Sequence, residues 1–118
     1  MSRILIVEDE QHLADGLRFN LEAEQHDVDL VDNGEEALRR LTAEPNRYDL
    51  VILDVMLPGI DGFAVADQLR KLEDPPVVIL TSSRDRADYG RCIGECGAHG
   101  FVPKADLSGA AIAAFFAA

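Results

Sequence analysis

Hydrophobic residues in this chain form two kinds of pattern, short unbroken runs and longer stretches with a helical period. The unbroken runs are rich in Val and Ile and lie at Arg3 to Val7, Leu50 to Leu53 and Val77 to Leu80. Such runs are typical of strands that are buried on both faces of a parallel sheet. Two weaker runs, Asp27 to Val31 and His99 to Val102, predict strands at or near the sheet edges.

Helical periods fill the segments between these strands. Leu13, Leu17 and Leu21 recur every four residues and predict one apolar stripe on a first helix, which Glu8 or Asp9 could cap. The other expected helices are marked by a cap or an apolar stripe at Asn33 to Leu41, at Ala66 to Leu72, from Asp85 or Asp88 to a C-terminal Gly97, and from Asp106 or Ser108 onward.

This alternation of strands and helices predicts an α/β fold. Because crossovers between parallel strands are right-handed, the expected architecture is a doubly wound five-stranded parallel sheet with helices on both faces. Ligands of such sheets bind at the carboxyl ends of the strands. We therefore look for chemistry at that edge.

Composition narrows the class of protein. A chain of 118 residues with 47% hydrophobic residues fits one domain, residues 1–118, with a proper core and with no output domain after it. The net charge of −11 argues against a nucleic-acid partner. Because the sequence has neither a run of 18 apolar residues nor a signal peptide, we expect a cytoplasmic protein that does not contact the membrane.

Two cysteines and a histidine offer a weak metal alternative. Cys92, Cys96 and His99 could form part of a zinc site, but structural zinc normally has four ligands and a fourth is not evident. Reduced thiols on a helix are the preferred interpretation.

Polar residues follow four of the five predicted strands at one edge of the sheet. Glu8 and Asp9 follow the first strand, Asp54 ends the third, Thr81 and Ser82 end the fourth, and Lys104 follows the fifth. Carboxylates that meet there repel each other by about 4 kcal/mol per pair at roughly 4 Å, so a cation is expected between them. Oxygen ligands favour Mg²⁺, or a similar hard cation such as Mn²⁺. Carboxylate, metal, hydroxyl and ammonium together suit phosphoryl transfer.

Three segments resemble the receiver domains of two-component response regulators. They are Ile4 to Glu10, Asp49 to Gly62 and Gly97 to Lys104, and the resemblance extends over essentially the whole chain. The fold that it implies is flavodoxin-like, with strand order 2-1-3-4-5. One departure is Ser82, which stands where alanine is frequent after the threonine.

The resemblance also implies roles for individual residues. Asp54 would be the phosphoacceptor, and the metal would be held by Asp54, Asp9, Glu8 and the backbone carbonyl of Met56. Thr81 would hydrogen-bond the phosphoryl oxygens and Lys104 would pair with them, while Phe101 would be the aromatic switch residue that follows Thr81 inward.

The implied partners are those of a signalling protein. A histidine kinase or a histidine phosphotransfer protein would donate the phosphoryl group, and an output protein or output domain would read a changed surface around the fourth helix, fifth strand and fifth helix. Such a phosphoprotein is not an enzyme that turns over an external substrate, because it catalyses only its own phosphorylation and dephosphorylation.

Two other classes of function remain as alternatives. A phosphorylation-independent interaction module would keep the fold without using the pocket. An aspartate-nucleophile phosphatase would need a second acid two residues after Asp54, where this chain has Met56. A flavin-binding protein of similar topology is disfavoured because Glu8, Asp9 and Glu10 would repel the phosphate of the cofactor.

The last predicted helix lacks a polar face. From Leu107 to Ala118 the sequence carries no charge, and Ile112, Phe115 and Phe116 lie among alanines. This pattern fits a partner or homodimer surface, and it equally fits a helix cut before a polar continuation.

Overall fold

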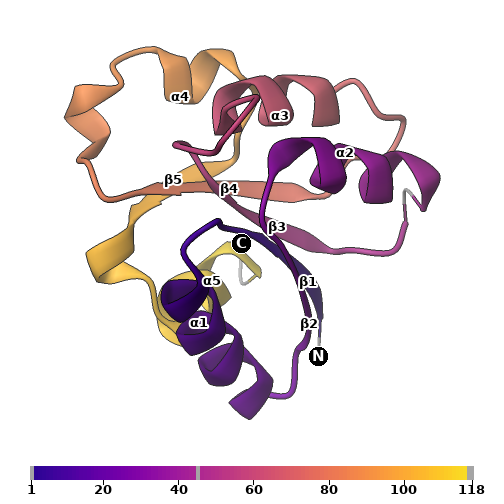
Figure 1. The fold of residues 1–118 in the computed structure, drawn as a ribbon, viewed down its shortest axis with the longest axis vertical. Helices are drawn as coiled ribbons and strands as arrows, with labels where there is room; N and C mark the ends of the chain where they lie inside the picture. Colours follow the sequence, from indigo (N-terminus) through magenta and orange to yellow (C-terminus); the bar gives the residue numbers. More distant parts are fainter. Residues whose placement is uncertain (1, 45, 117–118) are drawn as a thin grey trace.

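The computed structural model describes residues 2–44 and 46–116, with side chains up to residue 114. Within this part, the strands form one parallel sheet in the order β2-β1-β3-β4-β5 (Figure 1). The strands are β1 (Arg3–Val7), β2 (Asp27–Val31), β3 (Leu50–Asp54), β4 (Val77–Ser82) and β5 (Gly100–Pro103). The α-helices are α1 (Gln11–Ala23), α2 (Gly34–Ala43), α3 (Gly62–Leu69), α4 (Cys92–Glu95) and α5 (Gly109–Phe116), with two 3₁₀ turns, η1 (Arg86–Asp88) and η2 (Lys104–Asp106).

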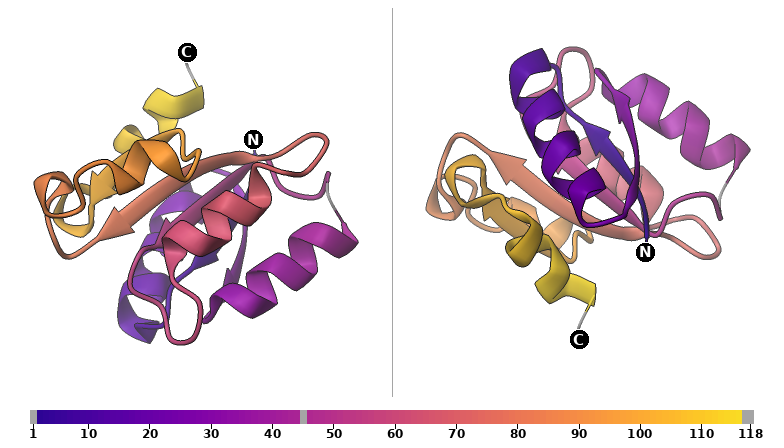
Figure 2. Two further views of the ribbon diagram at one scale, coloured as in Figure 1. Left: turned by 90° about the horizontal axis from the view of Figure 1, so that it is seen from above. Right: turned by 90° about the horizontal axis from the view of Figure 1, so that it is seen from below.

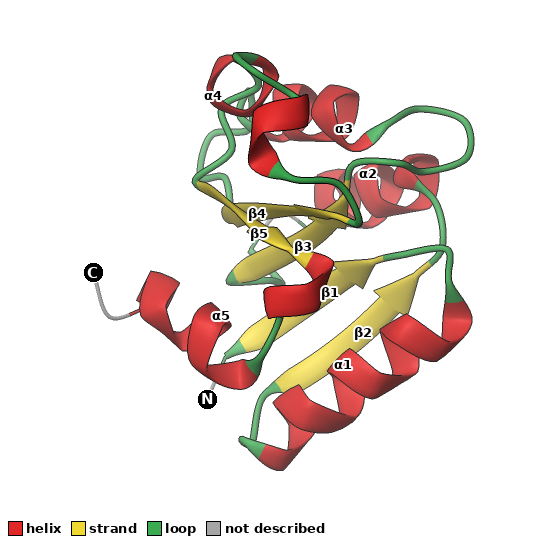
Figure 3. Ribbon diagram, turned by 90° about the vertical axis from the view of Figure 1, so that its left-hand side faces the viewer, coloured by secondary structure: helices red, strands yellow, loops and turns green. Residues whose placement is uncertain are grey.

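The helices cover both faces of the sheet, which confirms the doubly wound α/β fold and its predicted strand order. Helices α1 and α5 lie on one face and α2, α3 and α4 on the other (Figures 2 and 3). Each face has its own core, because successive residues of a strand point to opposite sides. Ile4, Ile6 and Ile52 pack with α1 and α5, whereas Leu5, Val51 and their neighbours pack with the other helices.

The strand predictions agree with the structure to within one or two residues at each end. All five residues of β3 are buried, as expected for the central strand of a parallel sheet. β2 is an edge strand in which only Val28 and Val31 are buried, which explains why its sequence gave the weaker signal.

Two predicted helix ends are wrong. Glu10, and not Glu8 or Asp9, caps α1, because its carboxylate accepts hydrogen bonds from the backbone N–H groups of His12 and Leu13. Helix α3 ends at Leu69 rather than at Leu72, because the chain tightens there into bonds that span three residues.

The predicted fourth helix is broken into two short pieces. Asp85 opens only the 3₁₀ turn η1, and Asp88 accepts a hydrogen bond from its backbone N–H. Gly90 follows with a φ of 56°, a conformation that interrupts a right-handed helix, so α4 begins only at Cys92. Gly97 has a φ of 82° and ends this helix, as predicted.

The last helix, α5, begins directly after Ser108, which was one of the two predicted starts. Ser108 accepts a hydrogen bond from the backbone N–H of Ala111, and Ile112 is fully buried against the sheet. The side chains of Phe115 and Phe116 lie outside the described residues, so the partner surface on this helix stays a prediction. None of the described helices combines the length and apolar character that crossing a membrane would require.

We expect the close contact between α3 and β3 to make Gly62 sensitive to substitution. A Cβ at Gly62 would lie 2.4 Å from the carbonyl oxygen of Asp54 and 2.8 Å from Cα of Val55, both of them backbone atoms that cannot move aside easily. Gly62→Ala should therefore lower the free energy of unfolding by about 1–3 kcal/mol, measured by urea denaturation.

Gly16 offers the matched control, because it lies inside α1 and, apart from its chain neighbours and the backbone of its own helix, no described atom is within 4 Å of its Cβ position. Gly16→Ala should raise the free energy of unfolding by about 0.5–1 kcal/mol, since alanine is the better helix former. Equal effects of the two substitutions would contradict this account.

Candidate functional site

The strands themselves deliver the polar residues to one place. On four strands, an apolar residue in the core under α1 and α5 is followed two positions later by a polar residue. The pairs are Ile6 and Glu8, Ile52 and Asp54, Ile79 and Thr81, and Val102 and Lys104. Asp54 and Thr81 lie within their strands and so point to the same side of the sheet as that core residue, whereas Glu8 and Lys104 come directly after theirs. The parallel register sets Asp54 beside Thr81 on the neighbouring strand, so these side chains meet at the carboxyl edge.

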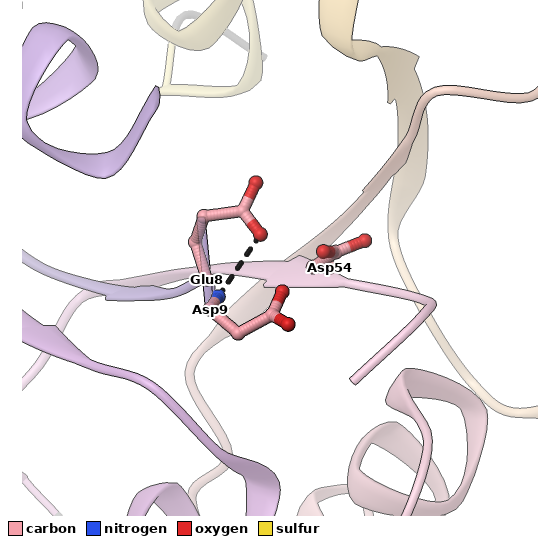
Figure 4. Close-up of side chains that lie close together, drawn as sticks. All are labelled: Glu8, Asp9 and Asp54. Atoms are coloured by element: carbon pink, nitrogen blue, oxygen red, sulfur yellow. Dashed lines mark hydrogen bonds between the residues drawn. The ribbon is translucent and has the colours of Figure 1, made fainter. Parts of the chain in front are cut away.

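Three carboxylates converge at this edge. One oxygen each from Glu8, Asp9 and Asp54 lies within 4.8 Å of the others (Figure 4). Asp9 is exposed, whereas Glu8 and Asp54 are only 6% and 2% exposed. Among the described residues this is the sole cluster of three or more acidic, His or Cys side chains close enough to share a metal ion, so the zinc alternative is not supported.

The residues of that zinc alternative have other contacts. Cys96 is buried and its thiol donates a hydrogen bond to the carbonyl oxygen of Ile93, while Cys92 is exposed. Nδ1 of His99 accepts a hydrogen bond from the backbone N–H of Val78 at 3.0 Å, which helps to join β5 to β4.

Lys104 lies between the two buried carboxylates. Its Nζ is 2.6 Å from Oε1 of Glu8 and 3.1 Å from Oδ2 of Asp54. Backbone groups hold the remaining oxygens: the N–H of Asp9 donates to Oε2 of Glu8, and the N–H of Met56 donates to Oδ1 of Asp54. Both oxygens of the Asp54 carboxylate are therefore fixed in position by a donor.

Burial and charge shift the pKa values of two of these groups. Burial raises the pKa of Glu8, and the nearby Asp54 raises it further, against the opposing effect of Lys104. Burial alone would lower the pKa of Lys104, but its hydrogen bonds to Glu8 and Asp54 outweigh this and raise it. The ammonium of Lys104 thus stays charged, while deprotonation of Glu8 is less favourable than that of an ordinary glutamate.

Thr81 has an unused hydrogen-bonding group at the edge of this cluster. Its side chain is 3% exposed, and its hydroxyl has no hydrogen-bond partner among the described residues. Leaving a buried hydroxyl unpaired costs about 1–3 kcal/mol, so such groups are rare in folded proteins and usually need an explanation.

Met56 follows β3 and Phe101 lies on β5, as the sequence predicted, but the Phe101 ring is already buried. Met56 follows β3 and its side chain is 54% exposed; its carbonyl as a metal ligand stays a prediction. Phe101 is already buried, at 8% exposure, on the face that carries α2, α3 and α4. The expected inward movement of Phe101 therefore also stays a prediction, and it cannot consist simply of burying an exposed ring.

Sequence reasoning missed Tyr89, which lies beside Phe101. The ring of Tyr89 packs against Phe101, with 5.8 Å between the ring centroids, and its hydroxyl is hydrogen-bonded to Ser82. The unusual serine after Thr81 was a signal, but its partner lies seven residues away in a segment without a regular pattern.

The donor set fits a hard divalent cation. Carboxylate oxygens are the ligands that Mg²⁺ takes in proteins, usually one or two of them together with water. Three carboxylates around one ammonium also leave an excess of negative charge, which a cation would neutralise. The site can therefore bind a metal and place a fixed carboxylate beside it.

Comparison with known proteins identifies relatives of this chain in sequence and in fold. The family model of the response regulator receiver domain matches residues 4–112. Response regulator ArlR of Staphylococcus saprophyticus is 43% identical over 88 residues, which are 75% of this chain and 39% of that protein. The match thus takes in well under half of the length of this relative.

Two solved structures show the same architecture. The BeF3-activated N-terminal receiver domain of Klebsiella pneumoniae RstA is 28% identical, with a TM-score of 0.83 over 98% of this chain and 95% of that one. The response regulator protein TrrA of Thermotoga maritima, in complex with Mg²⁺ and BeF, is 36% identical, with a TM-score of 0.77 over 87% of this chain and 86% of that one.

We expect the pH dependence of stability to reveal Glu8. Its pKa is raised from the ordinary value of 4.5, so the folded state binds the proton more tightly than the unfolded chain does. Stability that is present below this value is therefore lost as the pH rises through the raised pKa. In urea titrations without divalent cations, the free energy of unfolding of the wild type should fall relative to Glu8→Gln over this range, and added Mg²⁺ should reduce the difference.

Glu36 provides a control of opposite sign. A hydrogen bond from Arg39 lowers its pKa to about 2, so its contribution is present above the ordinary value and is lost on acidification. Glu36→Gln should therefore change the curve only at the acid end. Parallel curves for the wild type and Glu8→Gln would contradict the assignment.

Proposed function

The chain belongs to the response regulator receiver domain family of two-component systems, and we propose that Asp54 accepts a phosphoryl group in a reaction that requires a divalent cation. The observation that carries this proposal is the state of the Asp54 carboxylate. It is buried, held by the ammonium of Lys104 and the backbone N–H of Met56, and it lies beside Glu8 and Asp9. A carboxylate so placed can act as a nucleophile toward phosphorus.

The residues that would hold the cation are Glu8, Asp9, Asp54 and the carbonyl of Met56. Mg²⁺ is the preferred ion and Mn²⁺ is a substitute, because the ligands are hard oxygens. When bound, the cation supplies positive charge for the phosphoryl oxygens and offsets the repulsion among the carboxylates. The TrrA relative in complex with Mg²⁺ and BeF supports this assignment.

The transfer step needs little from the protein beyond position and charge. One oxygen of Asp54 attacks the phosphorus of a phosphohistidine on a histidine kinase or phosphotransfer protein. An O–P bond forms, the P–N bond breaks, and the bonding electron pair leaves with the imidazole nitrogen. With a small acyl phosphate as donor, the broken bond is P–O and the carboxylate leaves.

Two further residues would stabilise the phosphoryl group once it is on Asp54. Lys104 is already 3.1 Å from one oxygen of Asp54 and provides positive charge. Thr81 lies beside Asp54 in the sheet register and has a hydroxyl available to donate. Charge-assisted hydrogen bonds of this kind are about twice as strong as neutral ones.

These contacts would change the surface that a partner reads. Drawing Thr81 and Lys104 toward the phosphoryl group would alter the face formed by α4, β5 and α5, with Phe101 as the reporter residue. Shifting a two-state equilibrium from 1:99 to 99:1 needs about 5.5 kcal/mol. Several charge-assisted hydrogen bonds can supply it, and a downstream output protein or output domain would then bind the altered face of this single receiver unit.

Incubation with acetyl phosphate and Mg²⁺ should add one phosphoryl group to the intact protein, detected by mass spectrometry. Asp54→Asn should abolish the addition, because an amide oxygen does not form the acyl phosphate. Asp61→Asn is the matched control: Asp61 caps α3 through its carboxylate, and asparagine caps equally well, so phosphorylation should persist. A phosphoryl group that survives Asp54→Asn would refute the proposal.

Thr81→Val should have opposite effects on the free and the modified protein. Removing an unpaired buried hydroxyl should raise the free energy of unfolding by about 1–2 kcal/mol, measured in urea. It should also weaken the binding of beryllium fluoride with Mg²⁺, a mimic of the phosphoryl group, measured by calorimetry. Thr81→Ser, which keeps the hydroxyl, should retain the affinity; equal losses in both variants would contradict the role of the hydroxyl.

A further inference from the structure

Tyr89 fastens the chain after β4 to the last residue of that strand. Its hydroxyl is 2.5 Å from Oγ of Ser82, a fully buried residue, and Oγ of Ser82 also accepts a hydrogen bond from the backbone N–H of Arg84. The ring of Tyr89 lies between two others, with centroid distances of 5.3 Å to Phe63 and 5.8 Å to Phe101. One side chain thus joins β4, β5 and α3.

The segment around Tyr89 has few other attachments. Residues 83–88 are exposed, and the following α4 contains only four residues, of which Ile93 is buried. Gly90 and Gly94 lie in open surroundings: apart from chain neighbours and helix backbone, no described atom is within 4 Å of either Cβ position. The position of this segment therefore depends strongly on the contacts of Tyr89.

The hydrogen bond between Ser82 and Tyr89 lies next to the acidic site, so a movement of Thr81 would affect it. Ser82 directly follows Thr81, whose buried hydroxyl lacks a partner among the described residues. A shift of Thr81 toward a phosphoryl group on Asp54 would carry the backbone at Ser82 with it. Because the Ser82 and Tyr89 side chains are in hydrogen-bond contact, that shift would disturb Tyr89 and the Phe101 ring beneath it.

We propose that the Ser82–Tyr89 hydrogen bond is a clasp that holds the segment from Ser83 to Gly90, and the Phe101 ring with it, in the arrangement of the unphosphorylated chain. This hydrogen bond has to break when Thr81 moves toward the phosphoryl group, so it opposes the conformational change that phosphorylation would cause. Ser82 and Tyr89 are positioning residues that act through Thr81 and Phe101. The inference rests on the proposed function, because it concerns the response to a phosphoryl group on Asp54.

Tyr89→Phe tests the clasp, since it removes the hydroxyl and keeps the ring contacts with Phe63 and Phe101. Ser82→Ala tests the same bond from the other side. Both variants should bind beryllium fluoride more tightly than the wild type in saturating Mg²⁺, by about three- to tenfold, the factor that one neutral hydrogen bond contributes. The affinity for Mg²⁺ alone, measured by calorimetry, should stay unchanged, because neither residue belongs to the carboxylate cluster.

Hydrogen exchange of the unmodified protein gives a second readout. Residues 83–91 should exchange faster in both variants, and at the rate that the wild type shows only with beryllium fluoride bound. Tyr48→Phe is the matched control, because it removes a tyrosine hydroxyl that also makes a 2.5 Å hydrogen bond, to Asp29 on β2, the strand at the opposite edge of the sheet from β5. It should leave both readouts unchanged.

The possible outcomes separate the two proposals. A wild type that binds beryllium fluoride, with folded variants of unchanged or weaker affinity, would overturn the clasp and leave the proposed function intact. A tighter complex that appears equally in Tyr48→Phe would also overturn it. A wild type that fails to bind beryllium fluoride with Mg²⁺ would overturn the proposed function and the clasp with it.

Discussion

The packing of the hydrophobic sheet brings negatively charged side chains together at its carboxyl edge, where they repel one another. Two of the three carboxylates at the strand ends are buried, and like charges about 4 Å apart repel by roughly 4 kcal/mol at an effective dielectric constant near 20. Lys104 offsets part of this repulsion by contacting Glu8 and Asp54, and it leaves a net negative site. The core under α1 and α5 has to be strong enough to hold these residues there, and the same net charge favours a divalent cation.

This constraint explains why the surroundings of the site divide into rigid and loosely held parts. The strand that carries Asp54 is buried throughout, and Gly62 brings α3 so close to its end that even a methyl group would collide with backbone. The chain after Ser82 is different: it begins with the exposed residues 83–88, which include a 3₁₀ turn, and continues into a four-residue helix. The nucleophile is therefore fixed on one side, while the segment that would respond to its modification is held by few contacts.

The difference between the rigid sheet and the loosely held segment after β4 also explains which residues could be predicted from the sequence. The predicted strand ends placed Glu8, Asp54, Thr81 and Lys104 at one edge, because the carboxyl ends of parallel strands meet at the same edge of a sheet. The cap at Glu10 was missed because three acidic residues in a row give no local means of choosing among them. Tyr89 was missed because its partners are set by tertiary packing: Ser82 is on β4, and Phe63 and Phe101 belong to distant segments. The interruption of the fourth helix depends on the positive φ of Gly90, which a helical apolar pattern conceals.

Adjacent residues at the end of β4 then act in opposite directions. Within the described part of the chain the buried hydroxyl of Thr81 has no partner, at a cost of about 1–3 kcal/mol, and a phosphoryl group would remove that cost. Ser82 contributes a hydrogen bond of about 0.5–1.5 kcal/mol to the free state, which the same movement would disturb. A ligand shifts an equilibrium only by the difference in its interaction with the two states. These two contributions are of similar size and opposite sign. The charge-assisted contacts of Lys104 and the cation with the phosphoryl group would therefore have to provide most of the driving free energy. Thr81 and Ser82 would set the equilibrium between the two states before phosphorylation.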